Sequence, residues 1–155
     1  ALCDRVVLLD RGRVVQDGTP ADLFEHPAAP FVLDFLGSVN IFHGRVENGR
    51  AHLGPLSVAY SGAPDDGAHP ASGYARSWEI ELSRDLDGTE GFPATVRHVA
   101  AAGAVVRPEL APDDGTALKV EISRERFAEL APSPGDRLRV VPRNVRVFLG
   151  GPEHR

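Results

Sequence analysis

The first forty residues alternate short apolar runs with turn residues. Segments 5–10 and 13–16 are apolar runs of strand length, and the Arg-Gly pair between them predicts a tight β-hairpin. Thr19 and the proline after it suit the N-cap and first position of a helix, which is expected over 21–25. A second short helix is expected from Pro30, because the apolar positions that follow fall on one helical face.

After residue 40, apolar and polar positions alternate over short segments that turn residues separate. Residues 61–73 and 85–91 are rich in turn residues and are expected to be loops. Ser123 suits the N-cap of a third helix, expected over 123–130. Short strands between turns are typical of a small barrel or sandwich, so the pattern predicts a mainly β fold. The strands are expected at 41–47, 51–53, 56–60, 74–82, 92–97, 104–110, 118–122, 137–140 and 144–148.

The composition limits the class of protein. The chain has 155 residues, 42% hydrophobic and 25% charged, which suits one globular domain or one domain and part of another. Its net charge of −5 argues against a nucleic-acid-binding module, which usually carries a basic surface. Cys3 is the single cysteine, which excludes a disulfide framework and a cysteine-based metal site. The sequence begins at Ala1 and contains no methionine, so we expect a piece of a longer protein.

Several short motifs occur in a specific order near the N-terminus. Asp-Arg-Val-Val-Leu-Leu-Asp-Arg-Gly-Arg at 4–13 is followed by Gly-Thr-Pro at 18–20 and by His-Pro-Ala-Ala-Pro-Phe-Val at 26–32. In this order they resemble the end of the nucleotide-binding domain of an ABC importer ATPase. Phe-Leu-Gly-Ser-Val-Asn-Ile-Phe-His-Gly at 35–44 resembles the subgroup that serves sulfate and thiosulfate import. Residues 45–155 resemble more loosely the C-terminal regulatory domain of such ATPases, called TOBE.

The resemblance implies a division into domains and a fold. Residues 1–37 would be the C-terminal tail of a truncated nucleotide-binding domain, and residues 38–150 a TOBE or OB-like regulatory domain. The expected fold class is mainly β: a small OB-like, TOBE-type β-barrel with two short N-terminal helices and one late helix. In the family, two regulatory domains meet in the ATPase dimer, and the apolar positions Val145, Val147 and Phe148 would favour such contact.

The resemblance also implies what this chain lacks. The family's phosphate-binding loop, signature sequence, Walker B acid and switch histidine lie upstream of Ala1, and no G-x-x-x-x-G-K-[ST] motif occurs. We therefore expect no catalytic, cofactor-binding or metal-binding residue in this fragment, which should be inactive alone. The full subunit would hydrolyse ATP with Mg²⁺. Its implied partners are a second ATPase subunit and the membrane permease subunits, at the cytoplasmic face of the cell membrane.

Four residues are candidates for a regulatory or interface role. Asn40 and His43 flank the entry into the second domain, where they would form a polar junction that senses the neighbouring subunit, or would only satisfy a tight turn. Arg76 lies where the family carries a Val-Arg-Pro-His-like motif, but Ser77 and Trp78 replace the proline and histidine. Arg76 would either pair with an acid inside the regulatory dimer or remain a cation on a surface strand.

An alternative function is that of a small-oxyanion-binding OB-like module. Such a site would combine backbone N–H groups with Ser, Thr or Arg side chains, and Arg76, Ser83 and Arg97 are candidates. The last strands add further cations, which on a half-buried strand more often form a solvated face: Arg137, Arg139, Arg143 and Arg146.

Metal binding has little support in the sequence. The acid pairs at 65–66 and 113–114 stand beside glycine, where acids are expected in turns for backbone reasons. The histidines that would have to form a cluster lack zinc spacing: His52, His69, His98 and His154. A third function, oligonucleotide binding, would need exposed aromatic residues on a positive groove, which the acidic composition disfavours.

Overall fold

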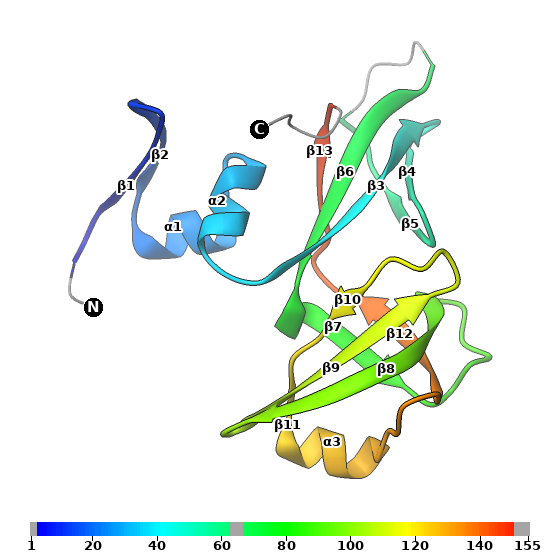
Figure 1. The fold of residues 1–155 in the computed structure, drawn as a ribbon. Coiled ribbons are helices and arrows are strands. Elements are labelled where there is room, and N and C mark those ends of the chain that lie inside the picture. Colours follow the sequence, from blue (N-terminus) through cyan, green and yellow to red (C-terminus); the bar gives the residue numbers. More distant parts are fainter. Residues whose placement is uncertain (1–2, 63–66, 151–155) are drawn as a thin grey trace. The chain divides into compact units, whose positions relative to one another are not determined.

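The computed structural model describes residues 3–62 and 67–150 (Figure 1). Contacts between Cα atoms divide the chain into two compact units, Ala1–Val39 and Asn40–Arg155. We call them the N-terminal unit and the C-terminal unit. Acid pair 65–66 and His154 lie outside the described residues.

The N-terminal unit is a β-hairpin followed by two helices. Strands β1 (Val6–Asp10) and β2 (Arg13–Gly18) pair antiparallel, and helices α1 (Pro20–Glu25) and α2 (Pro30–Phe35) follow. The predicted hairpin and both predicted helices are confirmed. A small apolar core holds these elements together, and its buried members are Leu8, Leu23 and Val32.

A reciprocal pair of hydrogen bonds starts α1. The Asp22 N–H donates to Thr19 Oγ1, and the Thr19 N–H donates to the Asp22 carboxylate, each over 3.1 Å. Two N–H groups that the first helical turn leaves unpaired are thereby satisfied. The hydrogen bonds from the backbone and side chain of Thr19 hold the pKa of Asp22 below its usual value.

The outer face of the hairpin is apolar. Val7, Leu9 and Val14 are 48%, 60% and 61% exposed. Side chains alternate between the two faces of a strand, so Leu8 points into the small core while its two neighbours on β1 point away from it. The described part of the chain leaves this apolar face uncovered.

The C-terminal unit contains two sheets. The first sheet has the order β13-β6-β3-β4-β5 (Figure 1). Its strands are β3 (Val39–Glu47), β4 (Arg50–Leu53), β5 (Leu56–Ala59), β6 (His69–Arg76) and β13 (Arg146–Leu149). Strands β13 and β5 lie at its two edges.

The pairing of β3 with β4 depends on three backbone positions. Asn48 and Gly49 have φ of 52° and 74°, the two positive angles of the hairpin turn that an Asn-Gly pair predicts. At Gly44 the backbone of β4 approaches so closely that a Cβ atom would overlap the carbonyl oxygen of His52. A residue with a side chain could occupy position 44 only if β4 moved.

The second sheet has the order β10-β9-β8-β12-β7, and β11 also pairs with β9. Its strands are β7 (Ile80–Ser83), β8 (Phe92–Ala102), β9 (Val105–Pro112), β10 (Leu118–Lys119), β11 (Ile122–Ser123) and β12 (Arg137–Pro142). The strands expected at 92–97 and 104–110 correspond to β8 and β9, which pair antiparallel across a turn at Gly103.

Helix α3 (Arg124–Leu130) follows β11 and is anchored at both ends. The Arg126 N–H donates to Ser123 Oγ over 3.1 Å, so the predicted N-cap is confirmed. At the other end the Arg84 guanidinium donates to the carbonyl oxygens of Leu130 and Ala131 over 2.9 and 3.0 Å. A cation is favourable there, because the last carbonyl groups of a helix lack intrahelical donors.

One hydrophobic core joins the two sheets. Phe42 of the first sheet packs edge to face on Phe92 of the second, with 6.1 Å between ring centroids. Apolar side chains of both sheets and Leu130 of α3 complete this core. The predicted mainly β fold with two early helices and one late helix is confirmed. Among the described residues the strand pairs leave both sheets open and do not close a barrel.

One loop prediction and one strand prediction are wrong in detail. Residues 61–73 are not a loop throughout, because β6 begins at His69 and its small residues pair with β13. Gly73 lies so close to Leu53 that a Cβ atom would meet the leucine side chain, and this is why small residues suit this strand. Segment 118–122 is also not one strand, since β10 and β11 pair with separate parts of β9.

The predicted strand over 74–82 is also interrupted. A 3₁₀ turn, Ser77–Glu79, separates β6 from β7. The Glu79 carboxylate accepts a hydrogen bond from the Arg76 N–H over 3.3 Å, and this local bond favours the turn. The interruption changes the direction of the chain and takes it from the first sheet to the second.

Candidate functional site

Asn40 links the two sheets through its side chain. Its Nδ2 donates to the Lys119 carbonyl oxygen over 2.7 Å, and its Oδ1 accepts from the Lys119 N–H over 2.8 Å. Asn40 lies near the start of β3, and Lys119 ends β10. The side-chain amide of Asn40 bonds both main-chain groups of Lys119, as the backbone of a neighbouring strand would. Asn40 is buried, which makes both bonds important for the local structure.

His43 lies three residues further along β3 and is exposed. Its Nδ1 atom lies 3.2 Å from Oγ of Ser72, a buried residue of the neighbouring strand β6. This contact orients the imidazole within the first sheet. Asn40 and His43 therefore contact different partners.

Arg76 and Trp78 lie at the turn between the sheets. Arg76 is fully buried, and its Nη1 lies 3.7 Å from the Glu79 carboxylate. Its guanidinium carbon lies 5.9 Å from the Trp78 ring centroid, within the range of a cation–π contact. The second arginine at this turn, Arg146, donates to Glu79 over 3.1 Å.

These contacts change the interpretation of Arg76. The expected cation on a surface strand is wrong, because the side chain is buried at the end of β6 and pairs with an acid of its own chain. Glu79 was not singled out from the sequence, although its carboxylate contacts both Arg76 and Arg146. Burial of a charge is unfavourable unless it is paired, so Glu79 stabilises the arginine in this position.

The arginines of the last strands are paired with carboxylates. Each has a partner within 3.6 Å: Arg137 with Asp113, Arg139 with Asp85, Arg143 with Glu81 and Glu90, and Arg146 with Glu79. The hydrogen bond from Arg143 also holds the pKa of Glu81 below its usual value. These pairs reduce the positive potential that a small oxyanion would require.

The other proposed oxyanion residues lie on different elements. Arg76 is buried at the end of β6, Ser83 ends β7, and Arg97 is exposed on β8. The Ser83 hydroxyl accepts a hydrogen bond from the Asp85 N–H over 3.1 Å. Ser83 therefore has a structural partner in the turn that follows β7.

The acid pair at 113–114 lies in a turn, as the sequence predicts. Oδ1 of Asp114 accepts from the Thr116 N–H over 2.9 Å, and Asp113 pairs with Arg137. Within residues 3–62 and 67–150, no group of three or more His, Cys, Asp or Glu side chains is arranged to hold a metal ion. His98 lies 3.6 Å from Glu109 and forms at most an ion pair with it.

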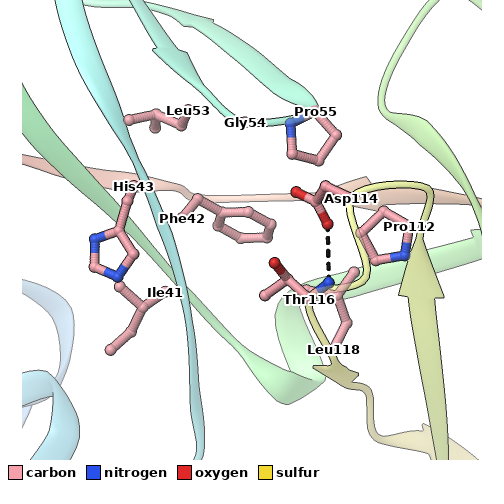
Figure 2. Close-up of a pocket in the computed structure, with 10 residues that line it drawn as sticks. All are labelled: Ile41, Phe42, His43, Leu53, Gly54, Pro55, Pro112, Asp114, Thr116 and Leu118. Atoms are coloured by element: carbon pink, nitrogen blue, oxygen red, sulfur yellow. Dashed lines mark hydrogen bonds between the residues drawn. The ribbon is translucent and has the colours of Figure 1, made fainter.

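A cavity of about 220 Å³ lies between elements of both sheets in the C-terminal unit (Figure 2). Strand β3, the turn from β4 to β5, and the connection from β9 to β10 contribute to its wall. The residues that line it are Ile41, Phe42, His43, Leu53, Gly54, Pro55, Pro112, Asp114, Thr116 and Leu118. We call it the intersheet cavity.

The intersheet cavity has an apolar floor and a polar rim. Phe42, Leu53 and Leu118 are buried, whereas Asp114 and Thr116 are exposed. Figure 2 shows the Phe42 ring pointing toward Asp114 and Thr116, while the imidazole of His43 lies on the other side of β3. Asp114 is the single carboxylate among the lining residues.

Of the four candidates from the sequence, His43 alone is among the residues that line this cavity. Asp114 was interpreted as a turn residue, and the hydrogen bond that its Oδ1 accepts within the turn confirms this interpretation. The cavity itself depends on the approach of β3 to β10, which are almost eighty residues apart. The Pro-Asp-Asp-Gly turn was visible in the sequence, but its position opposite Gly54 was not.

Comparison with known proteins gives matches over most of the chain. Residues 86–143 match the TOBE-like domain family. The chain is 44% identical to the sulfate/thiosulfate import ATP-binding protein CysA of Nitrosomonas europaea, over 95% of this chain and 41% of that protein. It is 39% identical to the protein of the same name from Bacillus cereus, over 96% of this chain and 42% of that protein.

A solved structure shows the same fold. The cytoplasmic molybdate-binding protein ModG, with molybdate bound, superposes with a TM-score of 0.57 at 21% identity. The superposition covers 73% of this chain and 96% of ModG. The similarity supports an OB-like fold for the C-terminal unit.

The curated relatives are much longer than this chain, which spans about two fifths of their length. The matches confirm the resemblance to the C-terminal part of a sulfate/thiosulfate-type ABC importer ATP-binding subunit. No helix of the described residues is both long enough and apolar enough to cross a membrane.

Proposed function

We propose that this chain is the C-terminal, regulatory part of the ATP-binding subunit of an ABC importer for sulfate or thiosulfate. The observation that carries the proposal is the identity of 44% over almost the whole chain with a protein of that name. The TOBE-like match within the C-terminal unit supports the same conclusion. The whole subunit would bind ATP and Mg²⁺ and would act with membrane permease subunits at the cytoplasmic face of the membrane.

We propose that residues 1–37 are the tail of the nucleotide-binding domain. The exposed apolar face of the β1–β2 hairpin supports this assignment. Exposed apolar surface is unfavourable in water, and the body of a nucleotide-binding domain would cover it. Residues 38–150 would then be the regulatory domain, which contributes no catalytic residue.

The regulatory domain would hold two ATP-binding subunits together and tune their closure. Strand β13 lies at the edge of the first sheet, so one of its sides is free of strand pairing within residues 3–62 and 67–150. Its residues Val147 and Phe148 are half-buried, and Leu149 is exposed. An edge strand with apolar side chains can pair with a second copy of itself. Asn40, His43, Arg76 and Trp78 would act indirectly, by fixing the sheets that carry this edge.

Sulfate uptake by the intact transporter tests the proposal. The coding sequence before Ala1 should contain a phosphate-binding loop and a signature motif, and the full subunit should restore sulfate uptake to cells that lack their own. A full subunit with the apolar edge changed at Leu149 should keep ATP binding but dimerise more weakly in sedimentation experiments. An upstream region without these motifs, or a full subunit inactive in uptake, would contradict the proposal.

The fold of ModG favours a second candidate, a module that binds a small oxyanion. The carboxylate partners of the late arginines and the acidic rim of the intersheet cavity argue against it. Equilibrium dialysis of the chain with sulfate and molybdate separates the two functions. Saturable binding of either anion would favour the oxyanion module.

A further inference from the structure

The intersheet cavity carries a negative charge beside an apolar floor. Asp114 Oδ1 already accepts a hydrogen bond from the Thr116 N–H, and this bond fixes the orientation of the carboxylate. The other oxygen, Oδ2, faces the turn at Gly54, where a Cβ atom would lie 3.5 Å away. Oδ2 is therefore held toward the side of the cavity that Gly54 and Pro55 form.

The aromatic ring of Phe42 adds apolar surface to the cavity. Phe42 extends toward Asp114 in Figure 2, and its T-shaped contact with Phe92 holds the ring in place. Proline and leucine side chains line the same space, so the cavity offers apolar contact area beside the carboxylate. A carboxylate beside apolar walls suits a cation that carries an apolar group.

An anion would be disfavoured at the same place. None of the described residues that line the cavity is an arginine or a lysine, and the imidazole of His43 lies on the other side of β3. Asp114 would repel a sulfate or a molybdate, because like charges at short range raise the free energy of the complex. The charge distribution therefore separates this cavity from the oxyanion function considered above.

We propose that the intersheet cavity binds a small organic cation, an ammonium or amidinium group attached to a ring or short apolar chain. The cationic group donates hydrogen bonds to Asp114 Oδ2, and the apolar part lies against Phe42 and Leu53. A volume of about 220 Å³ accommodates a molecule of the size of benzylammonium. This inference goes beyond the transport function and does not depend on it.

The ligand would contact both sheets at once. Phe42 and Leu53 belong to the first sheet, whereas Leu118 belongs to the second and precedes the Lys119 that Asn40 binds. A bound cation would therefore stabilise the same intersheet contact that the Asn40 amide makes. Binding in the cavity would therefore raise the free energy needed to separate the two sheets at this junction.

Three probes of similar size and different charge test the proposal on the 155-residue chain. Benzylammonium, benzyl alcohol and phenylacetate are titrated separately, and ¹H–¹⁵N spectra follow the amides of Phe42, Leu53 and Thr116. Benzylammonium should give saturable shifts in the millimolar range, benzyl alcohol about fivefold weaker binding, and phenylacetate none. Equal binding of benzylammonium and benzyl alcohol, preference for phenylacetate, or no saturable shift with any probe would overturn the proposal.

Two adjacent substitutions locate the charge that is responsible. Asp114→Asn keeps an oxygen that can accept from Thr116 but removes the charge and replaces Oδ2 by an N–H donor, so the turn should stay folded while benzylammonium binds at least about fivefold more weakly. Asp113→Asn is the matched control, because Asp113 pairs with Arg137 and does not line the cavity. Equal loss of binding in both variants would overturn the assignment to Asp114.

Discussion

Replacing Asn40 by alanine tests how strongly one side chain holds the two sheets together. The substitution removes the hydrogen bonds of 2.7 and 2.8 Å to the main chain of Lys119. It also leaves the Lys119 N–H and carbonyl groups without these partners. Asn40 is only 5% exposed, so water replaces the lost bonds incompletely.

The expected loss of stability follows from these two bonds. An intramolecular hydrogen bond contributes about 1 kcal/mol net, and an unsatisfied buried polar group costs about 1–3 kcal/mol. Partial access of water places the expected total at about 2–3 kcal/mol. For a domain on the order of 100 residues, this corresponds to a decrease in Tm of roughly 10–20 °C.

The assay can follow the C-terminal unit alone. Trp78 is the only tryptophan of the chain and lies in that unit, so its fluorescence reports the unfolding of that unit in urea or on heating. Lys119→Ala is the matched control, because Asn40 binds the main chain of Lys119 and not its exposed side chain. The control should change the free energy of unfolding by less than about 0.5 kcal/mol.

Two results would refute the reasoning. If Asn40→Ala unfolds at the same urea concentration as the unchanged chain, the two bonds do not stabilise the junction. If Lys119→Ala destabilises the unit as much as Asn40→Ala, the side chain of Lys119 is responsible and not its main chain. Asn40→Asp adds a third comparison, since it keeps the acceptor but places a charge against the Lys119 carbonyl oxygen, and it should also be destabilising.

Three further predictions concern other parts of the chain. Gly44→Ala should lower the free energy of unfolding by about 1–3 kcal/mol, because its Cβ would overlap the carbonyl oxygen of His52; unchanged urea unfolding would contradict this. Asp22 should titrate below the usual pKa of an aspartate in carboxyl NMR spectra, and its contribution to stability, complete above the usual value, should be lost as the pH falls through the lowered pKa. Thr19→Ala should raise that pKa only in part, because it removes the side-chain hydrogen bond and keeps the larger effect of the backbone N–H; a pKa that does not respond would show that the Thr19 side chain does not contribute. MgATP titrated into the chain should release no heat beyond dilution, since the sequence lacks a phosphate-binding loop, and saturable micromolar binding would reveal a nucleotide site that the resemblance does not imply.

Local sequence signals predicted much of the fold. The hairpin turns, the Thr19 and Ser123 caps and the helix positions depend on neighbouring residues, and their chemistry is visible in the sequence. The break at Ser77–Glu79 was missed because the alternating pattern continued across it. A carboxylate three residues after the end of a strand can accept a hydrogen bond from a backbone N–H that would otherwise continue the strand pairing. This local bond competes with the extended conformation that an alternating pattern indicates.

The contacts of the candidate residues were less predictable, because their partners are distant in the sequence. Arg146 meets Glu79 across sixty-seven positions, and Asn40 meets Lys119 across seventy-nine. Nothing in the pattern around either residue indicates its partner. The order of the strands places β13 beside β6, and the packing of the two sheets brings β3 near β10.

Two groups of polar contacts connect the sheets of the C-terminal unit. The Arg76–Glu79–Arg146 group fixes the turn between the sheets, and the Asn40 amide fixes a second point of contact between them. The intersheet cavity adjoins the second point through Leu118. A ligand in the cavity would therefore act on one of two connections while the other stays intact. The shared core between Phe42 and Phe92 resists separation of the sheets.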